Sequence, residues 1–454
     1  MLFKNKNPRE HQGQKNADDP LIAVDIGSSV VRIIAGRVDS DGQVEIVGYS
    51  ETPSKGVTKG AVTDIQELGM VLASLVREFM DRFHIQFDRC MVAVPGCFIR
   101  SYNEHGTATV VSGMVTVADR NHAIENARAG LNLDSESELI HVIPQNYITQ
   151  TSQDVINPVG QYAKRIEVNT HIVDCQKSHA MNLRSVISMI SADMCISDII
   201  YSGIAASNAV LTEGEKEIGV CHIDIGGGTV SVTVYDNKRL ILSFGLFSGG
   251  DMITQAIAKR FGLSKNAAEK LKVSQGFADP QYMPPEVQEA KINVRMKDPF
   301  TEQDVIVPVV AGELAAEIKF CLTNICWQIA DRISRFVSDR QISLRLGAGF
   351  VLTGGVANTK FIDKVVENEL IGHAASYSQI QIGFNKVRIG RARGIHCELF
   401  DVRALQAPEL AVAVGLLRCG NSSLLENYSS EDPVEPKGVK TKFQKIKEWF
   451  SREL

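Results

Sequence analysis

The sequence predicts an α/β fold built from two similar halves that face each other across a cleft, with a small subdomain inserted into each half. The first observation is a pair of strand–turn–strand patterns, at residues 21–34 and 220–235, each with an aspartate and glycines at its turn. The second is that further strand and helix patterns follow both turns in a similar order, as in an internal duplication. The third is a length of 454 residues, which requires two or three cores rather than one.

The first half follows a polar N-terminal tail, residues 1–19, which lacks the apolar stretch of a signal peptide and is expected to be disordered. Strands are expected at 21–24, 30–34 and 44–49. Asp64 then opens a helix whose apolar stripe consists of Ile65, Leu68, Leu72, Leu75, Val76 and Phe79. Residues 88–165 are expected to form a first insert, with strands at 91–94, 107–111 and 139–143 and a helix at 118–131. After this insert, a strand at 166–173 and a helix at 181–190 are expected to belong to the first half again.

The second half starts near residue 204 with a helix that precedes the second glycine turn. A strand at 239–244 and the turn Ser248–Asp251 lead into a further helix. Residues 265–346 form a second insert with one long helix at 312–339, on which Cys321, Cys326 and Trp327 are expected to pack in the core. The remaining elements are a strand at 349–352, a turn at 353–357 that opens a helix, a strand at 387–391 and a packed helix at 408–419.

Composition limits the function classes. A hydrophobic content of 44% and a charged content of 22% are typical of a globular protein. The net charge of −5 argues against nucleic acid as a partner, so any basic surface must be local. The nine cysteines form no Cys-x-x-Cys pair, which favours buried, reduced thiols over a zinc site. No stretch approaches 18 consecutive apolar residues, so no membrane-spanning helix is expected.

The two glycine turns have the chemistry of a phosphate site. Glycine allows the backbone to approach a ligand closely, and successive N–H groups form a concavity that holds phosphate oxygens. The residues with these roles are Gly27, Ser28 and Ser29 in the first turn, and Gly226, Gly227, Gly228 and Thr229 in the second. Asp25 and Asp224, at the strand ends, could hold a hydrated Mg²⁺ ion. Either turn alone could be an ordinary glycine hairpin, but the matched pair favours two cradles on one polyphosphate.

Together with the segment Leu352–Gly355, these turns are similar to the signature of the actin-like ATPases, which have a duplicated ribonuclease-H-like fold. The resemblance implies ATP and Mg²⁺ as ligands. It places Gly354 and Gly355 against the adenosine and Gly249 and Gly250 near the phosphates. It also implies that Glu269 and Lys272 contact the nucleoside.

Within that superfamily the chain resembles the FtsA family of bacterial cell-division actin homologues. The segments that carry the resemblance are Pro53–Val57 with Lys59-Gly60 and Val62, His141–Gln145, Asn157–Gly160 and Gly219–Tyr235. The resemblance implies four subdomains, which are 1A (20–87, 166–203 and 385–420), 1C (88–165), 2A (204–264 and 347–384) and 2B (265–346).

The same resemblance implies a polymerising protein that tethers FtsZ filaments to the cytoplasmic face of the inner membrane at the division septum. The implied partners are the C-terminal tail of FtsZ through 2B, other divisome proteins through 1C, and further copies of the chain. Ser231 stands where many relatives carry an acidic residue, and no general base or other catalytic residue is assignable from the sequence. We therefore expect at most a weak ATPase.

The C-terminal segment has the pattern of a membrane-binding helix. Residues 421–437 are a polar, proline-bearing linker, and residues 438–454 are amphipathic. The predicted lipid-facing residues include Phe443, Ile446, Trp449 and Phe450, and Lys442 and Lys445 are expected to meet anionic headgroups. The alternative is a terminal helix that packs on the protein's own core.

Two other functions remain open at this point. An actin-like assembly protein of the type IV pilus system would share the two turns and the first insert but would lack the basic tail. A phosphotransferase such as a sugar kinase would need a catalytic carboxylate in the cleft, aimed at a substrate hydroxyl.

Overall fold

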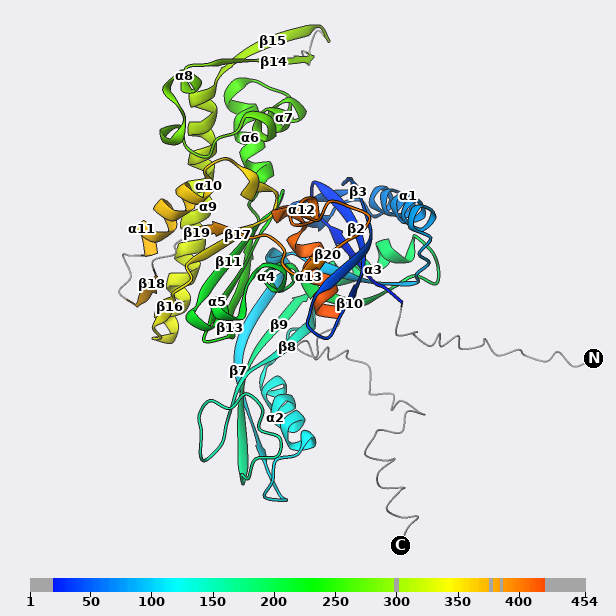
Figure 1. Ribbon diagram of the computed structural model, residues 1–454, viewed down its shortest axis with the longest axis vertical. Helices are drawn as coiled ribbons and strands as arrows, with labels where there is room; N and C mark the ends of the chain where they lie inside the picture. The colour runs from blue at the N-terminus through cyan, green and yellow to red at the C-terminus, as the bar shows by residue number, and fades with distance from the viewer. Residues whose placement is uncertain (1–18, 298–301, 375–378, 384–386, 421–454) are drawn as a thin grey trace, which may run out of the picture.

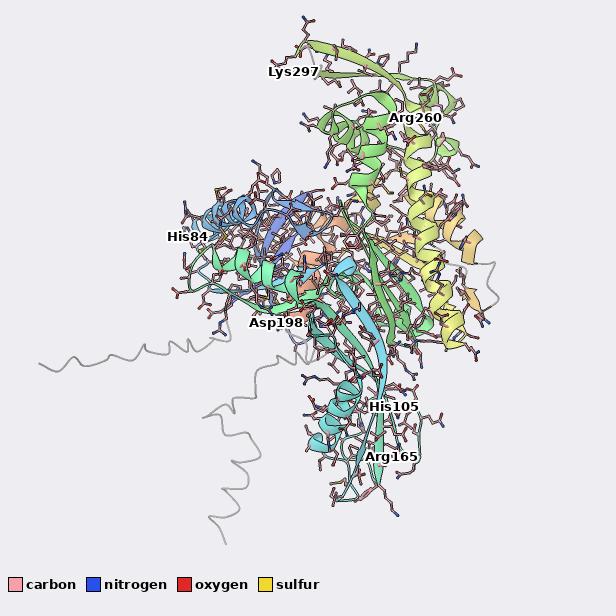
Figure 2. The ribbon with its side chains drawn as sticks, turned by 180° about the vertical axis from the view of Figure 1, so that it is seen from behind. His84, His105, Arg165, Asp198, Arg260 and Lys297 are labelled. Carbon is pink, nitrogen blue, oxygen red and sulfur yellow. The ribbon has the colours of Figure 1, made fainter. Side chains whose placement is uncertain are left out.

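Two β-sheets lie side by side in the middle of an elongated molecule, and an inserted subdomain extends from each end (Figure 1). The structure is a computed structural model that describes residues 19–297, 302–374, 379–383 and 387–420. Viewed from behind, His105 and Arg165 mark the first insert, and Arg260 and Lys297 mark the end that carries the second (Figure 2).

The first sheet forms from the N-terminal segment and two later strands. Its order is β10-β6-β1-β2-β3-β20. The strands are β1 Leu21–Ile26, β2 Val30–Val38, β3 Val44–Pro53, β6 Arg89–Val94, β10 Cys195–Tyr201 and β20 Ile395–His396. On one face lie α1 (Ile65–Phe83) and α3 (Lys177–Ser188), whose apolar residues pack against β1 and β2. Asp64 caps α1 by accepting a hydrogen bond from the Glu67 backbone N–H, as the sequence predicts.

The second sheet copies the topology of the first. Its order is β13-β12-β11-β17-β19. The strands are β11 Val220–Ile225, β12 Val230–Asp236, β13 Arg239–Leu246, β17 Phe350–Thr353 and β19 Val387–Ile389. In both sheets an antiparallel three-stranded unit is extended by two strands parallel to its first strand. The predicted duplicated α/β fold is therefore confirmed.

Each half carries one insert. The first insert is a sheet of order β7-β9-β8, made by β7 Ile99–Thr109, β8 Ser137–Ile148 and β9 Arg165–Gln176, with α2 (Val117–Gly130) packed on it. The second insert contains α7 (Lys265–Gln275), α8 (Pro285–Gln288), β14 (Lys291–Lys297) and β15 (Asp304–Val310). The long helix α9 (Ala311–Arg340) begins in this insert and continues beside the second sheet (Figure 1).

Shorter elements complete the fold. Those of the first half and its connection to the second are β4 Val57–Thr58, β5 Ala61–Val62, η1 Gly96–Phe98, α4 Ser202–Val210, α12 Val402–Leu405, η5 Pro408–Leu410 and α13 Ala411–Gly420. Those of the second half are α5 Glu213–Ile218, α6 Gly250–Phe261, η2 Pro280–Tyr282, β16 Leu344–Leu346, η3 Gly355–Asn358, α10 Ile362–Val366, η4 Glu367–Ile371, α11 Gly372–Ala374 and β18 Ile380–Ile382.

The structure moves three of the predicted domain boundaries. Residues 91–94 were expected in the first insert, but β6 pairs with β1 and β10 in the first sheet. Residues 166–173 were expected in the first half, but β9 lies in the middle of the insert's sheet. Residues 387–389 were also expected in the first half, but β19 pairs with β17 in the second sheet. In each case the local pattern predicts a strand but does not reveal which distant strand it pairs with.

The second insert also ends earlier than expected. Helix α9 also packs with α10 and η4, and β16 pairs with β18, so residues up to 346 do not all belong to the insert. Cys321 and Cys326 are buried as expected, but the expected burial of Trp327 is wrong. Its ring is about half exposed, and its indole N–H donates to Glu369 Oε2 at 3.1 Å.

The two halves are joined by a buried polar contact at the base of the cleft. The Tyr201 hydroxyl, from the end of β10, lies 2.8 Å from the carbonyl oxygens of Val232 and Phe244 in the second sheet. The Gly96 backbone N–H donates to Ser231 Oγ at 3.0 Å. Ser231 therefore holds the halves together and lies outside the cleft pocket.

The first insert covers the outer edge of the second sheet. Side-chain donors of the insert reach the free carbonyl oxygens of the edge strand β13. The pairs are Ser101 Oγ to Ser243 O at 2.7 Å, Asn103 Nδ2 to Ile241 O at 2.7 Å, and Gln145 Nε2 to Leu240 O at 2.6 Å. These bonds satisfy backbone groups that an exposed edge would leave open to pairing with another chain.

Some predictions concern parts of the chain that the structure does not describe. The N-terminal tail, the linker at 421–437 and the amphipathic segment at 438–454 lie outside the described residues, and so do Lys442, Lys445, Phe443, Ile446, Trp449 and Phe450. The membrane helix therefore stays a prediction. Within the described ranges, no helix has the length and apolar character needed to cross a bilayer.

Candidate functional site

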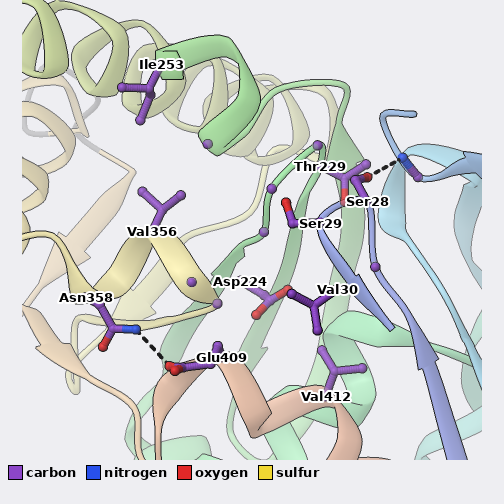
Figure 3. Close-up of a pocket in the computed structure, with 18 of the residues that line it drawn as sticks. Ser28, Ser29, Val30, Asp224, Thr229, Ile253, Val356, Asn358, Glu409 and Val412 are labelled. Carbon is purple, nitrogen blue, oxygen red and sulfur yellow. Dashed lines mark hydrogen bonds between the residues drawn. The ribbon is translucent and has the colours of Figure 1, made fainter. Parts of the chain in front are cut away.

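A pocket of about 380 Å³ lies in the cleft between the two sheets (Figure 3). This is in the usual size range for small-molecule sites. Every predicted phosphate, metal and nucleoside residue except Gly249 lines it. These residues are Asp25, Gly27, Ser28, Ser29, Asp224, Gly226, Gly227, Gly228, Thr229, Gly250, Glu269, Lys272, Gly354 and Gly355. Segments far apart in the sequence thus form one concave wall.

The two glycine turns have the same local hydrogen bond. In the first, the Gly27 N–H donates to Val30 O at 3.1 Å. In the second, the Gly226 N–H donates to Thr229 O at 2.9 Å. The turns connect antiparallel strands in equivalent positions of the two sheets. The duplication therefore produces two matching backbone cradles.

The cradles meet across the cleft, and only glycine fits at the point of contact. A Cβ atom on Gly227 would lie 2.1 Å from Ser29 Oγ, and one on Gly228 would lie 2.4 Å from Ser28 Oγ. A side chain at Gly228 would also meet the backbone of the first half, because its Cβ atom would lie 2.7 Å from Lys59 Cα. The structure brings the two predicted turns together, as the sequence reasoning requires.

Gly249 supports the second turn from behind. A Cβ atom there would lie 2.7 Å from the carbonyl oxygens of Gly226 and Gly227. The next two residues donate backbone hydrogen bonds to the same turn, from Gly250 N–H to Gly226 O at 3.0 Å and from Asp251 N–H to Gly227 O at 2.6 Å. The start of α6 thus fixes the second cradle.

Two buried carboxylates lie beside the cradles. Burial raises the pKa of Asp224 to about 6, and the negative charge of Asp25 raises it further. The hydrogen bond that Thr353 Oγ1 donates to Asp224 Oδ1 at 2.8 Å lowers this pKa in part. Burial also raises the pKa of Asp25, although Arg32 Nη1, 3.7 Å from Asp25 Oδ2, lowers it. His222 Nε2 lies 2.9 Å from Thr353 Oγ1 and continues this buried chain.

This donor set fits a hydrated Mg²⁺ ion. Mg²⁺ retains waters and takes one or two carboxylates together with substrate phosphates. Two neighbouring buried carboxylates repel each other, and a divalent cation would relieve that repulsion. Within the described residues no group of three or more His, Cys, Asp and Glu side chains could hold a metal by itself. Phosphates and waters would have to complete the coordination.

The other end of the pocket has a charged pair on α7. Lys272 Nζ donates to Glu269 Oε2 at 2.7 Å, to Thr254 Oγ1 at 2.8 Å and to Gly250 O at 3.0 Å. The Thr254 hydroxyl also donates to Glu269. Gly354, at a φ of 84°, allows β17 to turn into η3, because a Cβ atom there would lie 2.3 Å from Ile225 O. Glu269 and Lys272 are therefore held in place beside the predicted nucleoside site.

Sequence reasoning missed several residues that line the pocket. They include Arg32, Gly60, Asn358, Lys360 and Glu409. Asn358 Nδ2 donates to Glu409 Oε2 at 2.8 Å and links η3 of the second half to η5 of the first (Figure 3). Arg32 could have been found, because it lies opposite Asp25 in the hairpin register. Asn358 and Glu409 are 51 residues apart and carry no local signal.

The duplicated sheets and the paired cradles in the cleft define the actin-like ATPase class of folds. A solved structure described as the PilM-PilN type IV pilus biogenesis complex shares this fold, with a TM-score of 0.56 and 14% identity, covering 88% of this chain and 98% of that one. Family models match at residues 96–174, described as the SHS2 domain inserted in FtsA, and at residues 221–415, described as cell division protein FtsA. The first match coincides with the three-stranded insert.

Curated relatives extend the likeness over most of the chain. The cell division protein FtsA of Escherichia coli K12 is 27% identical over 434 residues, which cover 96% of this chain and 98% of the relative. The FtsA protein of Neisseria meningitidis serogroup B strain MC58 is 30% identical over 339 residues, covering 74% of this chain and 78% of the relative. The chain belongs to the FtsA family of cell division proteins.

Proposed function

We propose that this protein binds Mg-ATP in the cleft, with each half holding the phosphates from one side. The observation that carries the proposal is the contact between the two cradles, where a Cβ on Gly227 would lie 2.1 Å from Ser29 Oγ. Backbone N–H groups of the two turns and the hydroxyls of Ser28, Ser29 and Thr229 would donate to phosphate oxygens. Asp25 and Asp224 would hold hydrated Mg²⁺, which neutralises phosphate charge.

The nucleoside would lie toward α7 and η3. Glu269 and Lys272 would provide an acceptor and a donor for it, and the absence of side chains on Gly354 and Gly355 would permit a close approach. Both residues of the charged pair already line the pocket and are oriented by Thr254. The base would then face the second half while the phosphates contact both.

In this arrangement the nucleotide acts on the conformation of the protein. A ligand that binds both cradles favours the closed cleft, because it interacts better with that state than with an open one. The closed shape is the one we propose to polymerise with further copies of the chain. The proposed role is that of a scaffold with at most a weak ATPase.

At the level of the cell, we propose that the polymer links FtsZ filaments to the cytoplasmic face of the inner membrane at the septum and recruits later division proteins. Family membership and the amphipathic pattern of residues 438–454 support this. The second insert would receive the C-terminal tail of FtsZ, and the first insert would contact other divisome proteins. Many weakly binding tails on one polymer would attach it to anionic lipid by avidity.

A role in type IV pilus assembly is the alternative. The fold likeness to the PilM-PilN structure favours it. The basic amphipathic tail separates the two, because only the membrane-tethering role depends on it. Co-sedimentation of the full chain with anionic vesicles and purified FtsZ, with and without Mg-ATP, tests the proposal. Deletion of residues 439–454 should abolish the recovery of FtsZ with vesicles, and unchanged recovery would contradict it.

The nucleotide site is tested by Gly227→Val. The new side chain would overlap Ser29 and separate the cradles, so Mg-ATP binding measured by calorimetry should be lost while the circular dichroism spectrum is kept. Gly214→Val is the matched control, because a Cβ atom there meets only Thr212 Oγ1, at 4.0 Å. Wild-type affinity in Gly227→Val would refute the assignment of this turn to phosphate.

A further inference from the structure

A small hairpin closes the phosphate end of the cleft. It is formed by β4 and β5, which are joined by the two-residue turn Lys59-Gly60. Both turn residues have positive φ, 48° for Lys59 and 75° for Gly60. This is the geometry of the tight hairpin turns in which Asn or Asp usually precedes Gly. Lysine in the first position is uncommon there, which suggests a role for its side chain.

The turn lies directly on both cradles. The Gly60 N–H donates to Ser28 Oγ at 2.8 Å, a bond drawn in Figure 3. A Cβ atom on Gly228 would lie 2.7 Å from Lys59 Cα, and one on Gly60 would lie 2.9 Å from Thr229 Cγ2. A hairpin of the first half is therefore packed against the phosphate turn of the second half.

The position of the hairpin along the pocket is also defined. Figure 3 shows Ser28 and Thr229 together at the end away from Val356 and Asn358. The latter two lie on η3, the side proposed for the nucleoside. The hairpin thus lies where the last phosphate of a bound nucleotide would be.

The side-chain cations that line the cleft beside Asp25 and Glu269 are already paired with carboxylates. Asp25 and Asp224 are both acidic. Arg32 forms ion pairs with Asp25 and with Glu51, whose Oε2 atom lies 3.0 Å from Arg32 Nε. Lys272 is held by Glu269 at the other end of the pocket. Lys59 is exposed and makes no ion pair with any residue in the described part of the chain. Its four-carbon stem and compact charge suit phosphate binding.

We infer that Lys59 binds the terminal phosphate of a nucleoside triphosphate, and that the β4–β5 hairpin positions it there by resting on both cradles. This inference rests on the proposed nucleotide function and adds a residue that discriminates triphosphate from diphosphate. Because the same hairpin contacts the second half, a phosphate bound by Lys59 also stabilises the closed cleft.

Two variants remove the charge in different ways. Lys59→Met keeps most of the aliphatic stem, and Lys59→Asn places at this position a residue that readily adopts positive φ, so the hairpin is preserved. Lys238→Met is the matched control. Lys238 also has a positive φ, of 64°, and forms an ion pair with Glu217. It follows the seven-residue strand β12, whereas Thr229 precedes that strand, so the two residues lie at opposite ends of it. The separation is about 20 Å at about 3.3 Å per residue.

The experiment is a calorimetric titration of the full chain with Mg-ATP and Mg-ADP at low and moderate salt. Both Lys59 variants should weaken Mg-ATP about tenfold and Mg-ADP less than about threefold, as expected for loss of one charge-assisted hydrogen bond. Their ATP affinity should also depend less on salt. Lys238→Met should bind both nucleotides as wild type does.

Three outcomes would overturn the inference. Wild-type ATP affinity in both Lys59 variants would show that the ammonium does not touch the ligand. An equal loss for ATP and ADP would show that the hairpin only shapes the pocket. A wild-type chain that binds neither nucleotide would overturn the proposed function itself, and the wild-type titration separates that failure from the other two.

Discussion

Replacing Asp224 by asparagine tests whether the cleft is built for a ligand at the expense of stability. Asp224 is 9% exposed, and its Oδ1 atom accepts a hydrogen bond from Thr353. Burial is the main reason that its pKa rises from 3.8 to about 6. Asparagine has the same shape and keeps an oxygen that can accept the Thr353 hydrogen bond, but it carries no charge.

The size of the effect follows from linkage. The folded-state pKa is raised, so the folded protein loses stability as the pH rises from about 4 to about 6, and the penalty is complete above that range. The difference between 3.8 and about 6 corresponds to about 3 kcal/mol at 1.36 kcal/mol per pH unit. In the absence of nucleotide and Mg²⁺, Asp224→Asn should therefore be more stable than wild type by about 3 kcal/mol near pH 7.5. The gain should fall to about half near pH 5 and disappear below about pH 4.

Urea unfolding of the two proteins, followed by circular dichroism at several pH values, measures this difference. Asp41→Asn is the control, because Asp41 is exposed in the turn after β2. The Asp224→Asn variant should also lose the part of its ATP affinity that depends on Mg²⁺. A variant less stable than wild type near pH 7.5, or a gain that does not change with pH, would refute the reasoning that a buried charge dominates this position.

Three further perturbations test other parts of the structure. Tyr201→Phe removes the hydroxyl that bonds two carbonyl oxygens of the second sheet, so the free energy of unfolding should fall by about 1–3 kcal/mol. An unchanged midpoint of urea unfolding would contradict the proposed contact between the halves. Gly106→Ala puts a Cβ atom 2.1 Å from Ala123 O, so amide hydrogen exchange should become faster in residues 96–176 while the second sheet keeps its protection. Equally faster exchange in both regions would show that the insert does not unfold as a separate unit. Trp449→Glu places a charge in the predicted lipid-facing stripe, so vesicle binding should drop severalfold or more in co-sedimentation, and retention at the wild-type level would count against the membrane helix.

The sequence predicted the elements whose signals are local. Strand–turn–strand patterns with glycine specify both cradles, because an antiparallel hairpin pairs with its own neighbour and glycine marks the close approach. The strand β10 was missed. It contains Ser197 and Asp198 in the middle of its apolar run, and its pairing with β6 is interrupted by a bulge at this point. A strand of this kind is specified by its partner rather than by its own pattern.

The same distinction applies to the site. The cradle residues were found because each lies within a few positions of its aspartate. Asn358 and Glu409 enter the pocket only when the two halves are placed together, whereas Arg32 follows from the register of its own hairpin. The boundaries of the inserts failed for a related reason, since β6 and β9 both have strand patterns but join different sheets. Pairing between distant strands is a property of the assembled sheet.

The long helix α9 gives the molecule a path for mechanical load. Its 30 residues span about 45 Å and connect the second insert to the far side of the second sheet without a break. It packs with α6 and β15 and also with α10 and η4, and Trp327 near its middle donates to Glu369 of η4. Tension applied to the insert by any attached filament would be transmitted along one stiff rod into the base of that half, rather than being absorbed in a flexible linker.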